Sequence, residues 1–229
     1  MGQVNVKNIL VGFGDLYWAD YGTELPDLTG DANAIKLQEY FSADANWNYL
    51  GATQEGVELA YEPDYGEVEI DQLRDAAILF NQMVTVNMNT TLAEATLENL
   101  LIAWGVADEY LQQTGNGKVS SFSIGVPSEE PVERAVAVIG KGGVATYEVG
   151  DPGEETTVTA KRDRLYHGRR VLSVEGSTLS LSRTENTAFP VTFRLLPDPQ
   201  FPDSEYGVII DRIPGDDTAN PVPTNVFSN

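Results

Sequence analysis

Closely spaced acidic side chains are the residues of this sequence most able to do chemistry. They form two short runs, with Glu58 and Glu62 in the first and Glu67, Glu69 and Asp71 in the second. Hard oxygen ligands suit Ca²⁺ or Mg²⁺, and a carboxylate pair across a cleft could hydrolyse a glycosidic bond. The segment lacks the ligand spacing of a calcium-binding loop, and among 35 acidic residues some pair always has a suitable spacing. We therefore expect no metal, cofactor or catalytic residue here, and a solvent-exposed acidic face.

The single histidine, His167, lies within the most basic segment of the chain. A Ser-His-Asp triad would need this residue, but the sequence holds no Gly-x-Ser-x-Gly turn for a nucleophile. We therefore expect a surface histidine, or a loop histidine held by a hydrogen bond. The positive charges around it, which we call the basic island, are Lys161, Arg162, Arg164, Arg169 and Arg170. They either balance local charge or dock against the acidic face of a neighbouring subunit, because complementary patches orient association.

Composition narrows the classes of partner. The chain of 229 residues has 14 Lys and Arg against 35 Asp and Glu, a net charge of −21. This charge opposes binding to nucleic acid phosphates and to anionic membranes. There is no Cys, so disulfides and thiolate metal sites are excluded. No apolar run approaches the ~20 residues that span a bilayer, and the first residues lack a secretory signal, so we expect synthesis in the cytoplasm and no membrane contact.

Runs with period-two alternation dominate the chain and predict β-strands. The run 57–61 is followed by turn-forming residues at 63–66, so we expect it to form a hairpin with 67–71. In the run 83–88 every second residue is apolar, which predicts one buried face. Further strands are expected at 119–126, 132–139, 156–160, 170–174, 178–182, 190–196 and 207–213. The fold class is therefore mainly β (α+β), with an antiparallel β-sandwich or barrel-like core and long loops.

One helix is expected to flank this core, at about 92–104. Thr91 followed by Glu94 has the spacing of a capping box. The apolar stripe behind it consists of Leu97, Leu100, Leu101 and Trp104. Gly105 can end the helix in a left-handed conformation, and Trp104 should be its deepest anchor. Residues 31–41 are a weaker candidate that could equally be loop, and 72–80 fits neither pattern clearly.

We expect one domain over residues 1–213, because no composition break marks a linker. Residues 214–229 hold three Pro, two adjacent Asp and several small polar residues. This composition predicts a tail that is flexible or becomes ordered on a partner.

Several ordered motifs together resemble a known family. The segment 47–63 reads W-x-x-L-G-x-T-x-x-G-V into an alternating strand, and the likeness continues through 67–72 and 90–100. The opening strand at 9–17 ends in Asp-Leu-Tyr, and 190–197 is similar to the family's late strand. In these features the chain resembles the major tail (tail-tube) proteins of long-tailed bacteriophages.

The resemblance implies a virion structural protein, made in the host cytoplasm and assembled into the phage tail. It implies a β-sandwich or barrel-like core with a flanking helix, and homo-oligomeric rings, expected to be hexameric, stacked into a tube. Other tail proteins, such as the tape measure and the terminator, would be partners, and DNA would leave through the lumen without specific binding. The acidic residues would then face the lumen, where they would repel DNA phosphates. No catalytic residue or cofactor is implied.

Two alternatives remain open. The chain could be another virion or surface β-sandwich, such as a tail terminator or a monomeric carbohydrate-binding module. A binding module needs an exposed aromatic platform, which Tyr17, Trp18 and Tyr21 could form unless they pack on the core or on a neighbour. A carboxylate-based hydrolase is the third class, and it lacks any recognisable constellation.

Overall fold

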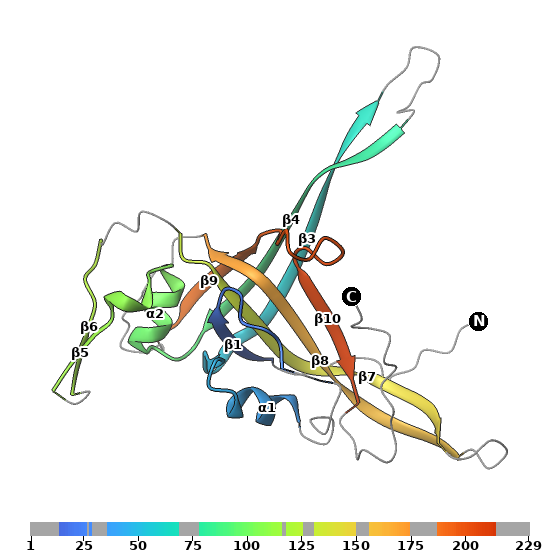
Figure 1. Cartoon of the computed structure of the whole chain (residues 1–229), viewed down its shortest axis with the longest axis horizontal. Coiled ribbons are helices and arrows are strands. Elements are labelled where there is room, and N and C mark those ends of the chain that lie inside the picture. The colour runs from blue at the N-terminus through green and yellow to red at the C-terminus, as the bar shows by residue number, and fades with distance from the viewer. Residues whose placement is uncertain are drawn as a thin grey trace.

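The computed structural model describes residues 14–26, 28, 36–68, 78–115, 118–125, 131–149, 156–174 and 187–213. Antiparallel strands dominate it (Figure 1). The strands are β1 Asp15–Asp20, β2 Asn48–Tyr49, β3 Thr53–Val68, β4 Ile78–Leu92, β5 Gln112–Thr114, β6 Val119–Ser121, β7 Arg134–Val149, β8 Thr156–Ser173, β9 Phe189–Leu195 and β10 Gly207–Arg212. The helices are α1 Leu37–Ala43, α2 Leu97–Ala103 and the 3₁₀ turn η3 Asp108–Tyr110. The predicted mainly β fold is confirmed.

The main sheet has the strand order β2-β1-β7-β8-β9-β4-β3, with β10 also paired to β8. Its two ends, β2 and β3, do not pair with each other, so the sheet does not close into a barrel. β5 and β6 form a separate two-stranded sheet. Long strand pairs reach beyond the body of the molecule, most clearly β3 with β4 (Figure 1).

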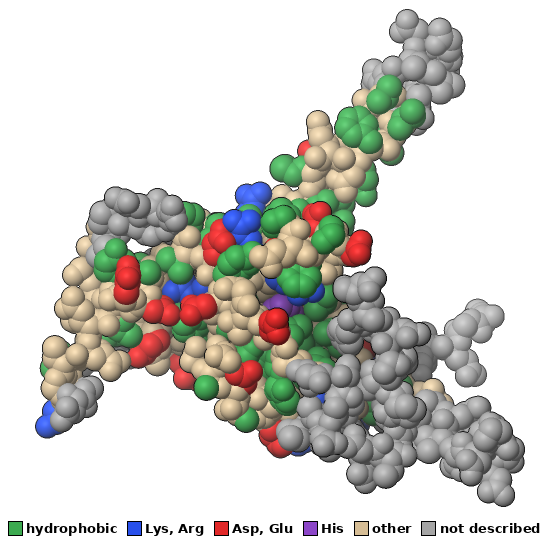
Figure 2. Space-filling model, in the orientation of Figure 1, with side chains coloured by type: hydrophobic (Ala, Val, Ile, Leu, Met, Phe, Trp, Pro, Cys, Tyr) green, Lys and Arg blue, Asp and Glu red, His purple; other side chains and the backbone are tan. Residues whose placement is uncertain are grey.

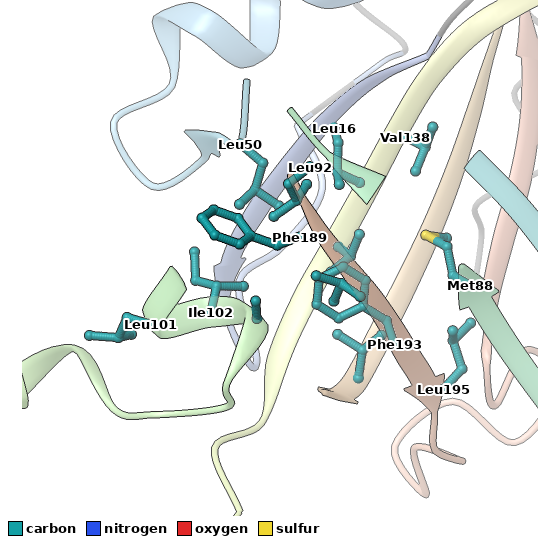
Figure 3. Packing of buried hydrophobic residues seen from close by; sticks show 14 of the residues in the cluster. Leu16, Leu50, Met88, Leu92, Leu101, Ile102, Val138, Phe189, Phe193 and Leu195 are labelled. Atoms are coloured by element: carbon teal, nitrogen blue, oxygen red, sulfur yellow. The ribbon is translucent and has the colours of Figure 1, made fainter. Parts of the chain in front are cut away.

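Two apolar clusters cover opposite faces of this sheet. The larger lies between its two halves: Leu16 and Val138 come from β1 and β7, while Met88 and Phe193 come from β4 and β9 (Figure 3). Helix α2 packs against the same cluster through residues 100–103. This burial gives the fold its sandwich-like character, because one curled sheet supplies both layers around a single core.

The second cluster lies on the outer face of β1, β7 and β8. Tyr17, Ala137 and Leu165 meet Leu37 and Phe41 of α1 there. Helix α1 corresponds to the end of the weaker helical candidate at 31–41, and 31–35 lie outside the described residues.

Strand β4 follows the predicted alternation closely. Val86, Met88, Thr90 and Leu92 are buried, and the residues between them are more exposed. This confirms the apolar face expected for the run 83–88.

The predicted turn at 63–66 is wrong. β3 runs unbroken through these residues and pairs along its length with β4, with one irregularity in register between Asp64 and Tyr65. Pro63 is tolerated because β3 lies at the end of the sheet, where one row of backbone N–H groups has no ladder to make. The ring of Phe80 lies over Gly66, where a β-carbon would collide with it. Local turn chemistry was therefore overridden by long-range strand pairing.

The flanking helix exists but is shorter than predicted. It begins at Leu97, and the hydroxyl of Thr96 accepts a hydrogen bond from the Asn99 N–H at 3.1 Å. Thr91 instead belongs to β4, and the Glu94 carboxylate accepts from the Ala52 N–H at 2.8 Å. The expected capping box is therefore wrong, and a second Thr five residues later caps the helix.

The end of this helix agrees better with expectation. Gly105 has a φ of +65°, which is the left-handed C-terminal conformation predicted for it. Trp104 is half-buried against Phe122, whereas Leu101 and Ile102 are almost fully buried, so Trp104 is not the deepest anchor. The predicted strand at 178–182 and the tail at 214–229 lie outside the described residues, as do 72–77.

Candidate assembly surfaces

The distal part of the β3–β4 hairpin projects from the body (Figure 1). We call it the arm, and it consists of residues 61–68 and 78–85. β9 pairs with β4 from Val86 onward, so within the described residues the arm's strands pair only with each other. The arm therefore presents two rows of unpaired backbone groups, which are a template for pairing with another chain.

Many apolar side chains are exposed on the arm, as the green side chains along it in Figure 2 show, beside the exposed acidic residues Glu62, Asp64 and Glu67 of β3. Ile78 and Leu79 are 60% and 62% exposed, respectively. The other exposed large apolar side chains of the arm are Tyr61, Tyr65, Val68, Phe80 and Met83. The whole of β4, 15 residues, carries no charged residue, although the chain has a net charge of −21. Contiguous apolar surface of this kind marks an interaction site.

Both faces of the arm contribute to this surface. Val68 lies opposite Ile78 and Gly66 lies opposite Phe80, and residues directly opposite each other share a face. Glu67 lies opposite Leu79 and shares the other face with it. The arm thus offers apolar contacts in two directions.

A second apolar feature is a hollow of about 330 Å³ in the body. It is lined by Val57, Leu59, Met88, Val138 and Tyr166. Met88 and Val138 are buried members of the main core, whereas Leu59 is 38% exposed. The hollow is therefore an apolar opening from the surface toward the core, between β3–β4 and β7–β8. We call it the apolar hollow.

The structure separates the acidic residues that the sequence grouped together. Glu58, Glu62 and Glu67 are exposed and lie on one strand, β3. By strand alternation, Glu58 and Glu62 share a face and Glu67 points to the other, so the expected pairing of two acidic strands is wrong. Glu69 and Asp71 lie outside the described residues. The lumen-facing role stays a prediction.

The basic island is also divided, because its arginines have different partners along β8. Arg164 donates two hydrogen bonds to Asp211, at 2.5 and 2.7 Å, and Arg162 lies 3.7 Å from the same carboxylate. The hydrogen bond from Arg164 lowers the pKa of Asp211, and the same contact raises the pKa of Arg164.

The remaining arginines of the island also have partners within the chain. Arg170 donates to Glu133 at 2.5 Å, and Arg169 donates to Ser204 at 3.1 Å while lying over the ring of Phe201. Local charge balance therefore accounts for much of the island. Its docking role stays a prediction.

His167 is neither at the surface nor in a loop, so that expectation is wrong. It lies in β8, opposite Ala137 and Val208, with 5% of its surface exposed. Its ring packs edge-to-face with the ring of Trp47, with 5.8 Å between the ring centroids. Neither ring nitrogen has a hydrogen-bond partner among the described residues. Burial, reinforced by the nearby Arg169, lowers the pKa of His167 from 6.5 to about 3.

The proposed aromatic platform is not assembled. Tyr17 is buried, Trp18 packs against the main core beneath the guanidinium of Arg134, and Tyr21 is 36% exposed. A polar hollow does lie beside Tyr17, but its groups bind one another: the Tyr17 hydroxyl lies 3.3 Å from the Ser42 hydroxyl. Tyr49, which is 52% exposed, also lines this hollow, and the carbohydrate-binding alternative stays a prediction.

No family model matches this sequence, and no curated protein matches it. Among the helices that the structure describes, none is long and apolar enough to cross a membrane. Across the same described residues, no group of three or more His, Asp or Glu side chains is arranged to hold a metal ion.

The arm is the feature that sequence reasoning missed. The signal was present, because residues 78–92 form 15 consecutive uncharged positions in a strongly acidic chain. Their even-numbered apolar residues suggested a buried face, but nothing local indicated that half of the strand leaves the body.

Proposed function

We propose that this protein is a structural subunit that polymerises, as stacked homo-oligomeric rings, into the tail tube of a long-tailed bacteriophage. The single observation that carries the proposal is the arm: a two-stranded projection rich in exposed apolar side chains, whose strands pair only with each other within the part of the chain that the structure describes. The chain would be a virion component without catalytic activity.

A lone monomer would gain little from such an arm. An isolated two-stranded hairpin is marginally stable in water, and exposed edges and apolar patches invite aggregation. The arm becomes favourable when neighbouring subunits cover its two faces. The net charge of −21 would keep subunits apart until they meet in the correct orientation.

A protein partner suits the arm better than a lipid surface does. The sequence between its strands, residues 69–77, includes Glu69, Asp71, Arg74 and Asp75. Charged residues in the sequence that joins the two strands, together with the exposed acidic residues of β3, oppose insertion of the arm into hydrocarbon. Identical subunits are the simplest partners, because repeated contacts between copies close into rings or extend into filaments.

The resemblance of the ordered motifs at 47–63, 67–72 and 90–100 to tail-tube proteins supports the same proposal. In such a tube the acidic excess would suit a lumen through which DNA passes without binding. Hexameric rings and partners such as the tape measure and terminator proteins follow from the resemblance alone.

The test is negative-stain electron microscopy of the purified protein, concentrated and examined over a range of salt concentrations. Rings or hollow tubes of uniform diameter are the expected result. A protein that sediments as a monomer at every salt concentration would contradict the proposal. Retention of that monomer on immobilised glycans would instead favour the carbohydrate-binding alternative.

A further inference from the structure

We propose that the arm of one subunit packs its Val68, Ile78 and Phe80 face into the apolar hollow of the next subunit. This inference rests on the proposed self-assembly and names the two surfaces that would meet. It assigns a partner to the hollow, namely a second copy of this chain.

The hollow is suited to apolar side chains. None of its five lining residues is charged, and its deepest members, Met88 and Val138, are almost fully buried. Apolar side chains that line an open hollow face water, so covering them with apolar atoms of another chain is favourable. Phe80 is the largest side chain on the arm face concerned, and it is 47% exposed.

The arm cannot fill the hollow of its own chain. Leu59 lines the hollow, and Val68 lies nine residues farther along the same strand. At about 3.3 Å per residue this separates the two by roughly 30 Å, and pairing with β4 keeps the strand extended. A contact between these surfaces must therefore join two copies.

Charge supports the same pairing. The acidic chain repels its own copies over most of its surface. The strand β4 and the lining of the hollow are both uncharged, and the acidic residues of the arm, Glu62, Asp64 and Glu67, all lie on β3. A contact made through β4 therefore brings few like charges together. Because the arm and the hollow are different surfaces, each subunit can place its arm on one neighbour and offer its hollow to another, and such a contact propagates into a ring or a filament.

The absence of Cys allows a direct test by cross-linking. One variant carries Ile78→Cys on the arm, and a second carries Leu59→Cys at the rim of the hollow. The two proteins are mixed and treated with a short bis-maleimide linker. The control pairs Ile78→Cys with Val119→Cys, because Val119 is 57% exposed on β6, in the separate two-stranded sheet that does not line the hollow.

We expect a covalent dimer from the Ile78→Cys and Leu59→Cys mixture and little product from the control mixture. A single chain that carries both changes should give a ladder of higher oligomers. Adding Phe80→Asp to the arm variant should reduce the cross-linked product by about tenfold, as loss of a central contact does.

The outcomes separate the inference from the proposed function. Rings or tubes without the specific dimer would overturn the inference and leave the function standing. Efficient cross-linking of Ile78→Cys with itself would also overturn it, because two arms would then pair symmetrically. The specific dimer without tubes would support the inference while contradicting the tail-tube proposal. Neither assembly nor dimer would overturn both.

Discussion

His167 is an ionisable ring held without a hydrogen-bond partner among the described residues, and its pKa of about 3 lies below the ordinary value of 6.5. Between these two values the unfolded chain binds a proton that the folded chain does not. The free energy of unfolding should therefore fall as the pH falls through this window. At about pH 5 the loss from this group should be about 2 kcal/mol relative to pH 7.

Urea unfolding at the two pH values checks this prediction. Replacing the ring by one that does not titrate, His167→Phe, keeps its contact with the edge of Trp47 and should remove this part of the pH dependence. His167→Asn is a second non-titrating variant for the case that Phe does not fit. Because each protein is compared with itself at two pH values, a lower baseline stability cancels. An unchanged pH dependence in both variants would show that His167 is not the responsive group.

Asn99 ties the start of α2 to two backbone carbonyls through one buried side chain. Its amide donates to the carbonyls of Leu50 at 2.8 Å and Glu94 at 3.0 Å, and its own N–H donates to the Thr96 hydroxyl. Asn99→Leu removes both side-chain donors from a buried site and should cost about 2–3 kcal/mol of unfolding free energy. Thr96→Ala, which removes the cap alone, should cost about 1 kcal/mol. Equal losses from the two variants in urea unfolding would contradict this assignment.

At the scale of elements, the arm should serve assembly and contribute little to folding. Ile78→Thr combined with Phe80→Thr removes apolar surface but keeps residues that suit a strand. The free energy of unfolding should change by no more than about 0.5 kcal/mol, as is usual for surface substitutions. Self-association measured by sedimentation should fall sharply. Val119→Thr removes a similarly exposed apolar residue from β6, in the separate two-stranded sheet, and should leave association unchanged.

The arm also shows which features of the fold sequence patterns can predict and which they cannot. Alternation predicted the buried face of β4 correctly, because that face is set by burial against β9 and the core. The continuity of β3 could not be read locally, since residues 63–66 have turn-forming types. Their conformation is decided by pairing with 78–85, from Pro63 opposite Val84 to Gly66 opposite Phe80. Pairing with a strand from another part of the sequence therefore outweighs the local turn preference.

The same limit applies to the helix cap and to the candidate sites. Thr91 and Thr96 both offer a hydroxyl before the helix, and strand pairing of Thr91 with Pro190 settles which one is used. The basic island was visible as composition, but its partners Asp211 and Glu133 come from other segments of the chain. Patterns located the charges, and tertiary contacts determined how many of them are balanced internally.

At the scale of the whole molecule, the sheet curls around a core but leaves both of its ends, β2 and β3, unjoined. A closed barrel would remove these edges within one chain. Here the outermost strand is instead the one that extends into the arm. In the proposed assembly, neighbouring subunits would complete what the single chain leaves open.

The charge of the molecule makes the salt dependence of that assembly a sharp test. Each subunit carries −21, so bringing copies together costs repulsion that salt screens. Apolar contact through the arm is insensitive to this screening. We therefore expect association to strengthen from about 20 mM to about 500 mM NaCl, a range over which the screening length falls severalfold. Sedimentation velocity at fixed protein concentration measures this association. Sucrose favours burial without screening charge, so it is the control that separates the effect of screening from that of burial. Association that weakens as salt rises would mean that attractive ion pairs between the basic island and an acidic face hold the subunits together, in place of the arm.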